Sequence, residues 1–244
     1  MDPELIRALA AVGVHVDSGE VLSERVFSVR HLGDSKALGR IRSSLERLVG
    51  PLPSLGIREG GAITLVGGKG VLHAGSAEIG LDRFRPYMGL SRETMTSLDA
   101  VEFPPGGLLV VENLTAFEAC CRGEVRGTPD ALIVWSAGYP GRGVHALVDQ
   151  AARRGAPVHV WADLDLDGVR IARLVGSWAG GGWRPHRMSP ADVGAAPVRR
   201  PLKPAAIDGI RSDLEANSDA PLAETLEALF QSGCWVEQET FLGR

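Results

Sequence analysis

Three aspartates at alternate positions, Asp163, Asp165 and Asp167, directly follow a short apolar run at 157–162. Gly168 comes next, and apolar residues then recur at helical spacing over 169–175. The pattern predicts a buried strand that ends in carboxylates and turns into a helix. Because ligands bind outside the carboxyl ends of the strands in open α/β sheets, we expect these carboxylates to face a ligand.

The chemistry of the three aspartates favours a hard divalent cation. Their negative charges repel one another unless a cation lies between them. They offer oxygen ligands, and no His or Cys lies among them, so we predict Mg²⁺ or Mn²⁺ rather than zinc. Three alternatives are a solvated acidic turn, an EF-hand loop and a haloacid-dehalogenase phosphatase motif. Leu174 stands where an EF-hand needs Glu, and the strand-like runs lie mostly upstream, unlike in the phosphatases.

Composition sets broad limits on the fold and the partners. The 244 residues, 44% of them apolar and 23% charged, allow one large domain or two small ones with a real core. A net charge of −4 argues against nucleic-acid binding by the overall field but leaves room for a local basic face. The three cysteines lack metal-ligand spacing and are expected as buried thiols in a reducing compartment. No signal peptide or membrane-spanning apolar run is visible, so we expect a cytoplasmic protein.

The elements that would position the aspartates follow from apolar periodicity. Three strand-like runs alternate with two helical patterns, which predicts an α/β fold with a parallel sheet, right-handed crossovers and helices on both faces. The first run ends in Glu112, so a parallel sheet would bring Glu112 to the same edge as Asp163. The runs are 108–111, 131–135 and 158–161, and the helices are 115–122 and 144–154.

The remaining segments are predicted from periodicity and from breaks rich in Gly and Pro. Helices at 3–12, 18–27 and 35–49 indicate an N-terminal helical subdomain, with part of a winged helix as the alternative. Strands at 62–66 and 71–73 are expected to pair as a hairpin around Gly67–Gly70, and helices at 205–216 and 222–231 form a C-terminal tail. The predicted domains are 1–60 (helical), 61–106 (connecting, β or irregular), 107–196 (α/β) and 197–244 (C-terminal helical extension).

Several short stretches together carry a family resemblance. A glutamate that closes one strand and an Asp-x-Asp that closes a later strand form the signature of the Toprim domain. The stretches around this pair resemble the C-terminal region of the JetD nuclease subunits of Wadjet plasmid-defence systems, a family similar to the A subunit of topoisomerase VI. They are SERVF at 23–27, GDSK at 33–36, VVENLTAF at 110–117, SAGYPG at 136–141, ADLDLDG at 162–168 and EQE at 237–239.

The resemblance implies a Toprim-like parallel-sheet domain and a metal-dependent DNA endonuclease, dimeric, that cuts DNA held by an SMC-type complex. By position, the catalytic acids would be Glu112, Asp163 and Asp165, which also bind Mg²⁺ or Mn²⁺. Further acids at the metal would be Asp167, Glu237 and Glu239. The topoisomerase relatives attack with a tyrosine of a winged-helix domain. The only tyrosines here, Tyr87 and Tyr139, do not fit that position, so attack by water is predicted.

Arginines near the expected acidic edge are candidates for contacts with DNA phosphates. They are Arg142, Arg170 and Arg173, and ordinary solvated helix charges are the alternative explanation for them. Two competing functions stay open. One is a non-catalytic Toprim-like module that binds DNA or a protein and regulates it, and the other is a nucleotidyl transferase of primase type.

Overall fold

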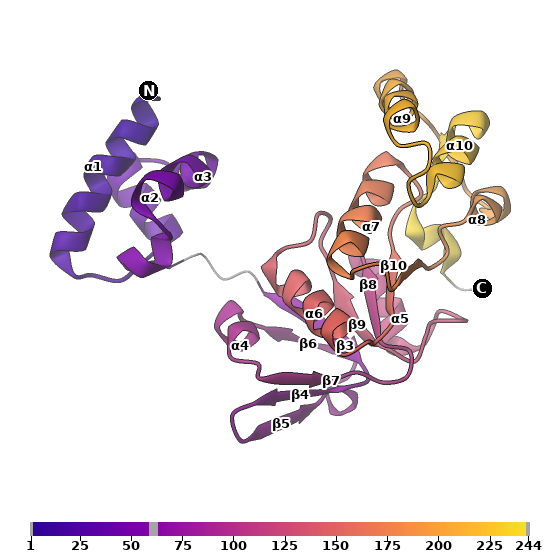
Figure 1. The fold of residues 1–244 in the computed structure, drawn as a ribbon, viewed down its shortest axis with the longest axis horizontal. Coiled ribbons are helices and arrows are strands. Elements are labelled where there is room, and N and C mark those ends of the chain that lie inside the picture. Colours follow the sequence, from indigo (N-terminus) through magenta and orange to yellow (C-terminus); the bar gives the residue numbers. More distant parts are fainter. Residues whose placement is uncertain (1, 59–62, 243–244) are drawn as a thin grey trace. The chain divides into compact units, whose positions relative to one another are not determined.

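The computed structural model describes residues 2–58 and 63–242. The chain forms two units, Met1–Ala62 and Ile63–Arg244 (Figure 1). The predicted four-part division is finer than these two units, and its internal boundaries stay a prediction.

The first unit is helical, as expected. Phe27, Leu38 and Leu45 are fully buried in its core. The second helix begins later than predicted because Ser23, not Ser18, caps it: the Ser23 hydroxyl accepts a hydrogen bond from the N–H of Val26 at 3.3 Å. No antiparallel wing is present among residues 2–58. The elements are α1 (Pro3–Ser18), β1 (Leu22–Ser23), α2 (Glu24–Leu32), α3 (Ala37–Val49), the 3₁₀ helix η1 (Leu52–Leu55) and β2 (Ile57–Arg58), which pairs with β1 in parallel.

The second unit is built on a six-stranded sheet in the order β11-β10-β8-β9-β3-β6. The first four strands in this order are mutually parallel, and β3 and β6 extend the sheet in antiparallel fashion. The α/β fold class is therefore confirmed, with an antiparallel extension that periodicity did not indicate. The strands are β3 (Thr64–Gly68), β6 (Tyr87–Leu90), β8 (Leu108–Val111), β9 (Leu132–Trp135), β10 (Val158–Trp161) and β11 (Trp183–Pro185).

Helices cover both faces of this sheet (Figure 1). The chain runs from β8 through α5 (Leu114–Arg122) to β9 on one side of β8. It then returns across β8 through α6 (Arg142–Arg153) to β10, and continues through α7 (Leu166–Trp178) to β11. Right-handed crossovers in opposite directions place α5 on one face and α6 and α7 together on the other. All four residues of β8 are buried, as expected for a strand covered on both faces.

The predicted hairpin at Gly67–Gly70 is wrong. β3 pairs with β6 and β9, whereas β4 (Val71–Ala74) pairs with β5 (Ala77–Gly80) and β7 (Ala100–Glu102) in a separate three-stranded sheet. Gly68 and Gly70 take positive φ values of 78° and 134°, which turn the chain from one sheet into the other. The start of the first predicted strand, Ala62, lies outside the described residues.

Short elements connect these sheets, and the C-terminal part adds helices, as predicted. The connecting elements are η2 (Leu81–Arg83) and α4 (Arg92–Thr96). The C-terminal elements are α8 (Pro190–Ala195), β12 (Arg200–Pro201), α9 (Pro204–Ala216), α10 (Ala223–Ser232), β13 (Cys234–Trp235) and η3 (Gln238–Phe241). After β13 the chain returns to the main sheet, where Val236 forms an antiparallel bridge with Leu164 just beyond β10.

Candidate active site

The carboxyl ends of β8 and β10 lie side by side. Val111 is paired with Trp161, and the N–H of Glu112 donates to the carbonyl of Trp161 at 3.0 Å. Beyond this point β8 leads to α5 on one face of the sheet and β10 leads to α7 on the other. Two neighbouring parallel strands whose connections leave toward opposite faces open a crevice between their ends, which is where α/β folds bind ligands.

Glu112 and Asp163 meet in this crevice. Oε2 of Glu112 accepts a hydrogen bond from the backbone N–H of Asp163 at 3.0 Å. Oδ1 of Asp163 in turn accepts from the backbone N–H of Gln238 at 2.8 Å. The indole of Trp135 holds the backbone on the other side, because its Nε1–H donates to the carbonyl of Glu112 at 2.8 Å. The structure thus brings together two acids that are 51 positions apart in the chain.

Asp165 and Asp167 lie at the start of α7 and have different surroundings. Asp165 caps the helix, with Oδ1 accepting from the N–H of Gly168 at 2.7 Å. A Cβ at Gly168 would lie 2.0 Å from the carbonyl oxygen of Asp163, so this tight turn requires glycine. Asp167 is exposed at the rim, where it accepts from the hydroxyl of Tyr139 at 3.3 Å.

The two C-terminal glutamates also differ. Oε1 of Glu239 accepts from the side-chain amide of Asn113 at 2.7 Å, and its Oε2 is buried with no hydrogen-bond partner among the described residues. Glu237 forms an ion pair with Arg200 at 3.0 Å, beside the β12–β13 pair. Glu239 therefore faces the centre formed by Glu112 and Asp163, whereas Glu237 is held by a cation outside it.

Sequence reasoning missed two polar residues at this centre, Asn113 and Gln238. Asn113 caps α5, and its Oδ1 accepts from the N–H of Thr115 at 2.8 Å. An asparagine between a strand and a helical pattern is a recognisable capping signal. Gln238 had no such signal, because its contacts are with residues 75 and 125 positions away.

Burial and mutual repulsion disfavour the charged forms of these acids. Burial raises the pKa of Asp163 to about 7. The hydrogen bond from the N–H of Gln238 opposes this rise, and the charges of Glu112, Asp165 and Glu239 add to it. Burial likewise raises the pKa of Glu112 and the pKa of Asp165, with hydrogen bonds from Asp163 and Gly168 opposing the rise and neighbouring carboxylates adding to it. The centre therefore carries an excess of negative charge that a cation would relieve.

The raised pKa of Asp163 predicts that the metal-free protein loses stability as the pH rises from its ordinary pKa of 3.8 to about 7. Within this window the folded protein keeps a proton that the unfolded chain releases, so the free energy of unfolding falls with rising pH. Asp163→Asn removes this titration. Urea denaturation in EDTA should therefore show the free energy of unfolding of wild type, relative to that of the variant, falling between pH 3.8 and about 7. A difference that is independent of pH would contradict the raised pKa.

The donor set fits Mg²⁺ or Mn²⁺. The ligands available are carboxylate oxygens, which these ions prefer. Within residues 2–58 and 63–242, no group of three or more His, Cys, Asp or Glu side chains is arranged to hold an ion by itself. Mg²⁺ is usually held by one or two carboxylates together with water and substrate phosphates, so a complete protein cage is not needed. The close approach of Glu112 and Asp163, with Asp165 beside them, meets that smaller requirement.

The three predicted DNA-contacting arginines lie in different settings. Arg142 is exposed at the start of α6, which follows the carboxyl end of β9. Arg170 is half-exposed on α7, with Nη1 at 3.6 Å from Oδ1 of Asp167. Arg173 is largely buried: Nη1 pairs with Asp213 at 2.6 Å, and Nε donates to the carbonyl of Pro221 at 2.7 Å. Its guanidinium is thus occupied in holding α9 against α7, which makes Arg173 a poor candidate for a DNA contact.

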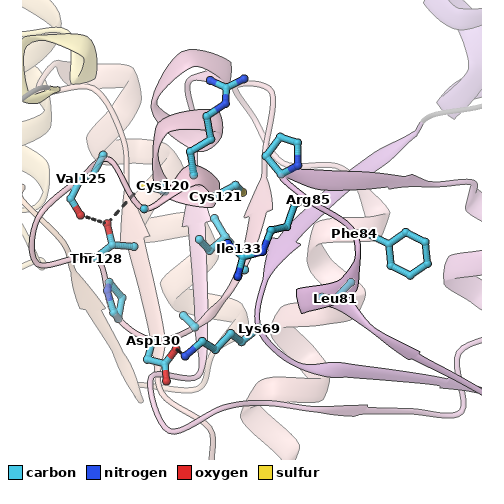
Figure 2. A pocket seen from close by; sticks show the side chains of 16 residues that line it. Lys69, Leu81, Phe84, Arg85, Cys120, Cys121, Val125, Thr128, Asp130 and Ile133 are labelled. Carbon is cyan, nitrogen blue, oxygen red and sulfur yellow. Dashed lines mark hydrogen bonds and ion pairs between the residues drawn. The ribbon is translucent and has the colours of Figure 1, made fainter.

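A hollow of about 470 Å³ lies at the opposite end of β9 from the acids (Figure 2). Lys69 and Arg85 point into it, and Lys69 pairs with Asp130 at 2.9 Å. Cys120 and Cys121 line its wall, and burial raises the pKa of these thiols to about 11 and about 12. Thiols with such values stay protonated at neutral pH. The expectation of buried thiols is confirmed for Cys120, whereas Cys121 and Cys234 are only half-buried.

Fold and site together define an α/β protein with an acidic centre at the carboxyl edge of its parallel strands. The chain belongs to the family described as "Protein of unknown function C-terminus (DUF2399)", whose model matches residues 88–244. The match runs from β6 to the C-terminus and includes every acid of the centre. No curated protein matches the chain. Among the helices of the described residues, none combines the length and apolar character that crossing a membrane requires.

Proposed function

We propose that this chain is a divalent-metal-dependent DNA endonuclease that hydrolyses phosphodiester bonds. The observation that carries the proposal is the hydrogen bond between Oε2 of Glu112 and the backbone N–H of Asp163, with Asp165 nearby as the N-cap of α7. A module that only bound nucleic acid would gain nothing from half-buried carboxylates with raised pKa values facing a phosphate backbone. The same carboxylates are useful when an ion neutralises them during the reaction.

In this proposal Asp163 and Asp165 hold the ion, and Glu112 either completes its ligands or accepts the proton of the attacking water. Bound Mg²⁺ or Mn²⁺ would supply charge neutralisation on the scissile phosphate and lower the pKa of a bound water. Asp167 stands at the rim and Glu239 inside, so both are supporting acids. Glu237 is the weakest member of the predicted set because Arg200 already neutralises it.

Water is the proposed nucleophile. Tyr139 is exposed at the rim, and its hydroxyl donates a hydrogen bond to Asp167 at 3.3 Å. Tyr87 lies on β6, and its hydroxyl donates a hydrogen bond to Glu118 at 2.6 Å. A covalent intermediate on a tyrosine requires that its hydroxyl lose the proton. The hydrogen bond to Glu118 raises the pKa of Tyr87, and burial raises the pKa of Tyr139, so both hydroxyls keep their protons. The proposed contacts with the DNA backbone are made by Arg142, at the start of α6 after β9, and by Arg170, on α7 after β10.

The resemblance to the JetD nuclease subunits supports a Toprim-type nuclease and suggests its context. The proposed setting is plasmid or phage defence in the cytoplasm, with a homodimer that cuts DNA presented by an SMC-type complex. The second candidate function is a Toprim-like regulatory module that binds DNA or protein without cleaving. The raised pKa values of Glu112 and Asp163, which are half-buried between the ends of β8 and β10, favour the enzyme.

A cleavage assay separates the two functions. Purified protein is incubated with supercoiled and with linear plasmid in Mg²⁺, in Mn²⁺ and in EDTA, and products are resolved on agarose gels. The enzyme converts supercoiled DNA to nicked or linear forms in either metal and not in EDTA. A protein that shifts DNA in a binding assay but leaves it intact in both metals would support the regulatory module instead.

A further inference from the structure

The C-terminal segment Val236–Glu239 reaches the centre from outside the parallel strands. Val236 and Leu164 exchange two backbone hydrogen bonds, at 2.9 and 3.1 Å, which attach the segment to the loop after β10. Phe241, at the end of the short 3₁₀ helix η3 that begins at Gln238, is buried in the main core. The segment is therefore fixed on both sides of residue 238, independently of any contact that residue 238 makes.

Gln238 joins the ends of the two strands that carry the acids. Its backbone N–H donates to Oδ1 of Asp163 at 2.8 Å. Its side-chain Oε1 accepts from the backbone N–H of Asn113 at 2.7 Å, directly after Glu112. A single residue thus binds the carboxylate after β10 and the backbone after β8.

The burial of Gln238 indicates that its two hydrogen bonds do more than fill space in the core. Gln238 is 1% exposed, and its amide orientation is fixed because the N–H of Asn113 needs an acceptor. Its Nε2 is then buried without a hydrogen-bond partner among the described residues. An unpaired buried amide costs free energy, and an apolar side chain of the same size would avoid that cost. An apolar side chain could not, however, accept the hydrogen bond from the backbone N–H of Asn113.

We propose that Gln238 is a positioning residue for the metal centre: it holds the Asp163 carboxylate and the Glu112–Asn113 backbone at the separation that a shared ion needs. The inference rests on the proposed function. Groups that orient metal ligands through hydrogen bonds are as important to a metal site as its ligands, and their loss typically lowers metal affinity or activity about 10–100-fold.

The test is binding of Mn²⁺ alone, followed by electron paramagnetic resonance of the free ion. Gln238→Ala removes the acceptor, and Gln238→Met removes it while keeping nearly the same volume, which guards against a folding defect. Gln231→Ala, at an exposed glutamine of α10, is the matched control. We expect both Gln238 variants to bind Mn²⁺ about 10–100-fold more weakly than wild type, with the control unchanged. Amide hydrogen exchange at Asn113 in the metal-free protein should also become faster in both.

The outcomes separate this inference from the function it rests on. If wild type binds Mn²⁺ and a folded Gln238 variant binds it equally well, the positioning role is wrong and the nuclease proposal stands. If wild type binds no Mn²⁺, both are wrong. In the cleavage assay, the Gln238 variants should lose kcat with little change in KM for DNA, because Gln238 is buried and its side chain is not exposed to a bound DNA.

Discussion

We expect Glu112→Gln and Asp163→Asn each to lower the rate of plasmid cleavage at least about a thousandfold, equivalent to about 4 kcal/mol of activation free energy. Both substitutions keep an oxygen that can accept the hydrogen bonds from Asp163 and Gln238, so the local fold is preserved. What they remove is the negative charge that holds the ion. The measurement is the initial rate of nicking in Mg²⁺ and in Mn²⁺.

Arg85→Ala is the control for this prediction. Arg85 lines the hollow at the opposite end of β9 and should leave the cleavage rate unchanged (Figure 2). A circular dichroism spectrum and melting temperature close to wild type would show that the two acid variants are folded. Cleavage by a folded Glu112→Gln or Asp163→Asn protein at the wild-type rate would remove these residues from the proposed machinery.

Asp213→Ala destabilises the second unit by about 3 kcal/mol, because removal of one partner of a buried ion pair leaves the other charge uncompensated. Asp213 is 7% exposed and Arg173 is 16% exposed at the side chain, and their atoms are 2.6 Å apart. The Nη2 atom of Arg173 already lacks a partner among the described residues, so the loss of Asp213 leaves little to stabilise the guanidinium. Urea denaturation followed by tryptophan fluorescence measures the change, since every tryptophan of the chain lies in the second unit.

Asp208→Ala provides the matched comparison on the same helix. Asp208 pairs with Arg211 at 3.3 Å, but the two side chains are 72% and 57% exposed. Exposed pairs contribute roughly 0–1 kcal/mol, so this variant should differ little from wild type. Equal effects of the two substitutions would mean that the Arg173–Asp213 pair does not hold α9 against α7.

The part of the fold that depends on local sequence was predictable. Strands such as 108–111 and 158–161 are short continuous apolar runs, and a parallel arrangement follows from the helices between them. Once the strands are parallel, Glu112 and Asp163 lie at the same edge of the sheet, and the neighbouring positions of β8 and β10 bring them together. Their proximity was therefore a consequence of topology, and it did not require knowledge of side-chain packing.

The parts that depend on distant partners were not predictable from pattern. β3 and β4 are separated by a short turn, yet β3 joins β9 in the large sheet and β4 joins β7 in the small one. Arg173 was expected either to contact DNA phosphate or to be a solvated helix charge. Only the approach of α9, some 40 positions later, turns it into half of a buried pair. Gln238 was overlooked for the same reason.

The central claim is that Glu112 and Asp163, with Asp165 beside them, share a divalent ion at the edge of the sheet. The most direct measurement is a crystal structure of the protein soaked in Mn²⁺, with anomalous scattering recorded at the manganese edge. We expect an anomalous peak at coordination distance from the carboxylates of Glu112 and Asp163. Anomalous density that is absent there, or that lies only at other residues, would contradict it.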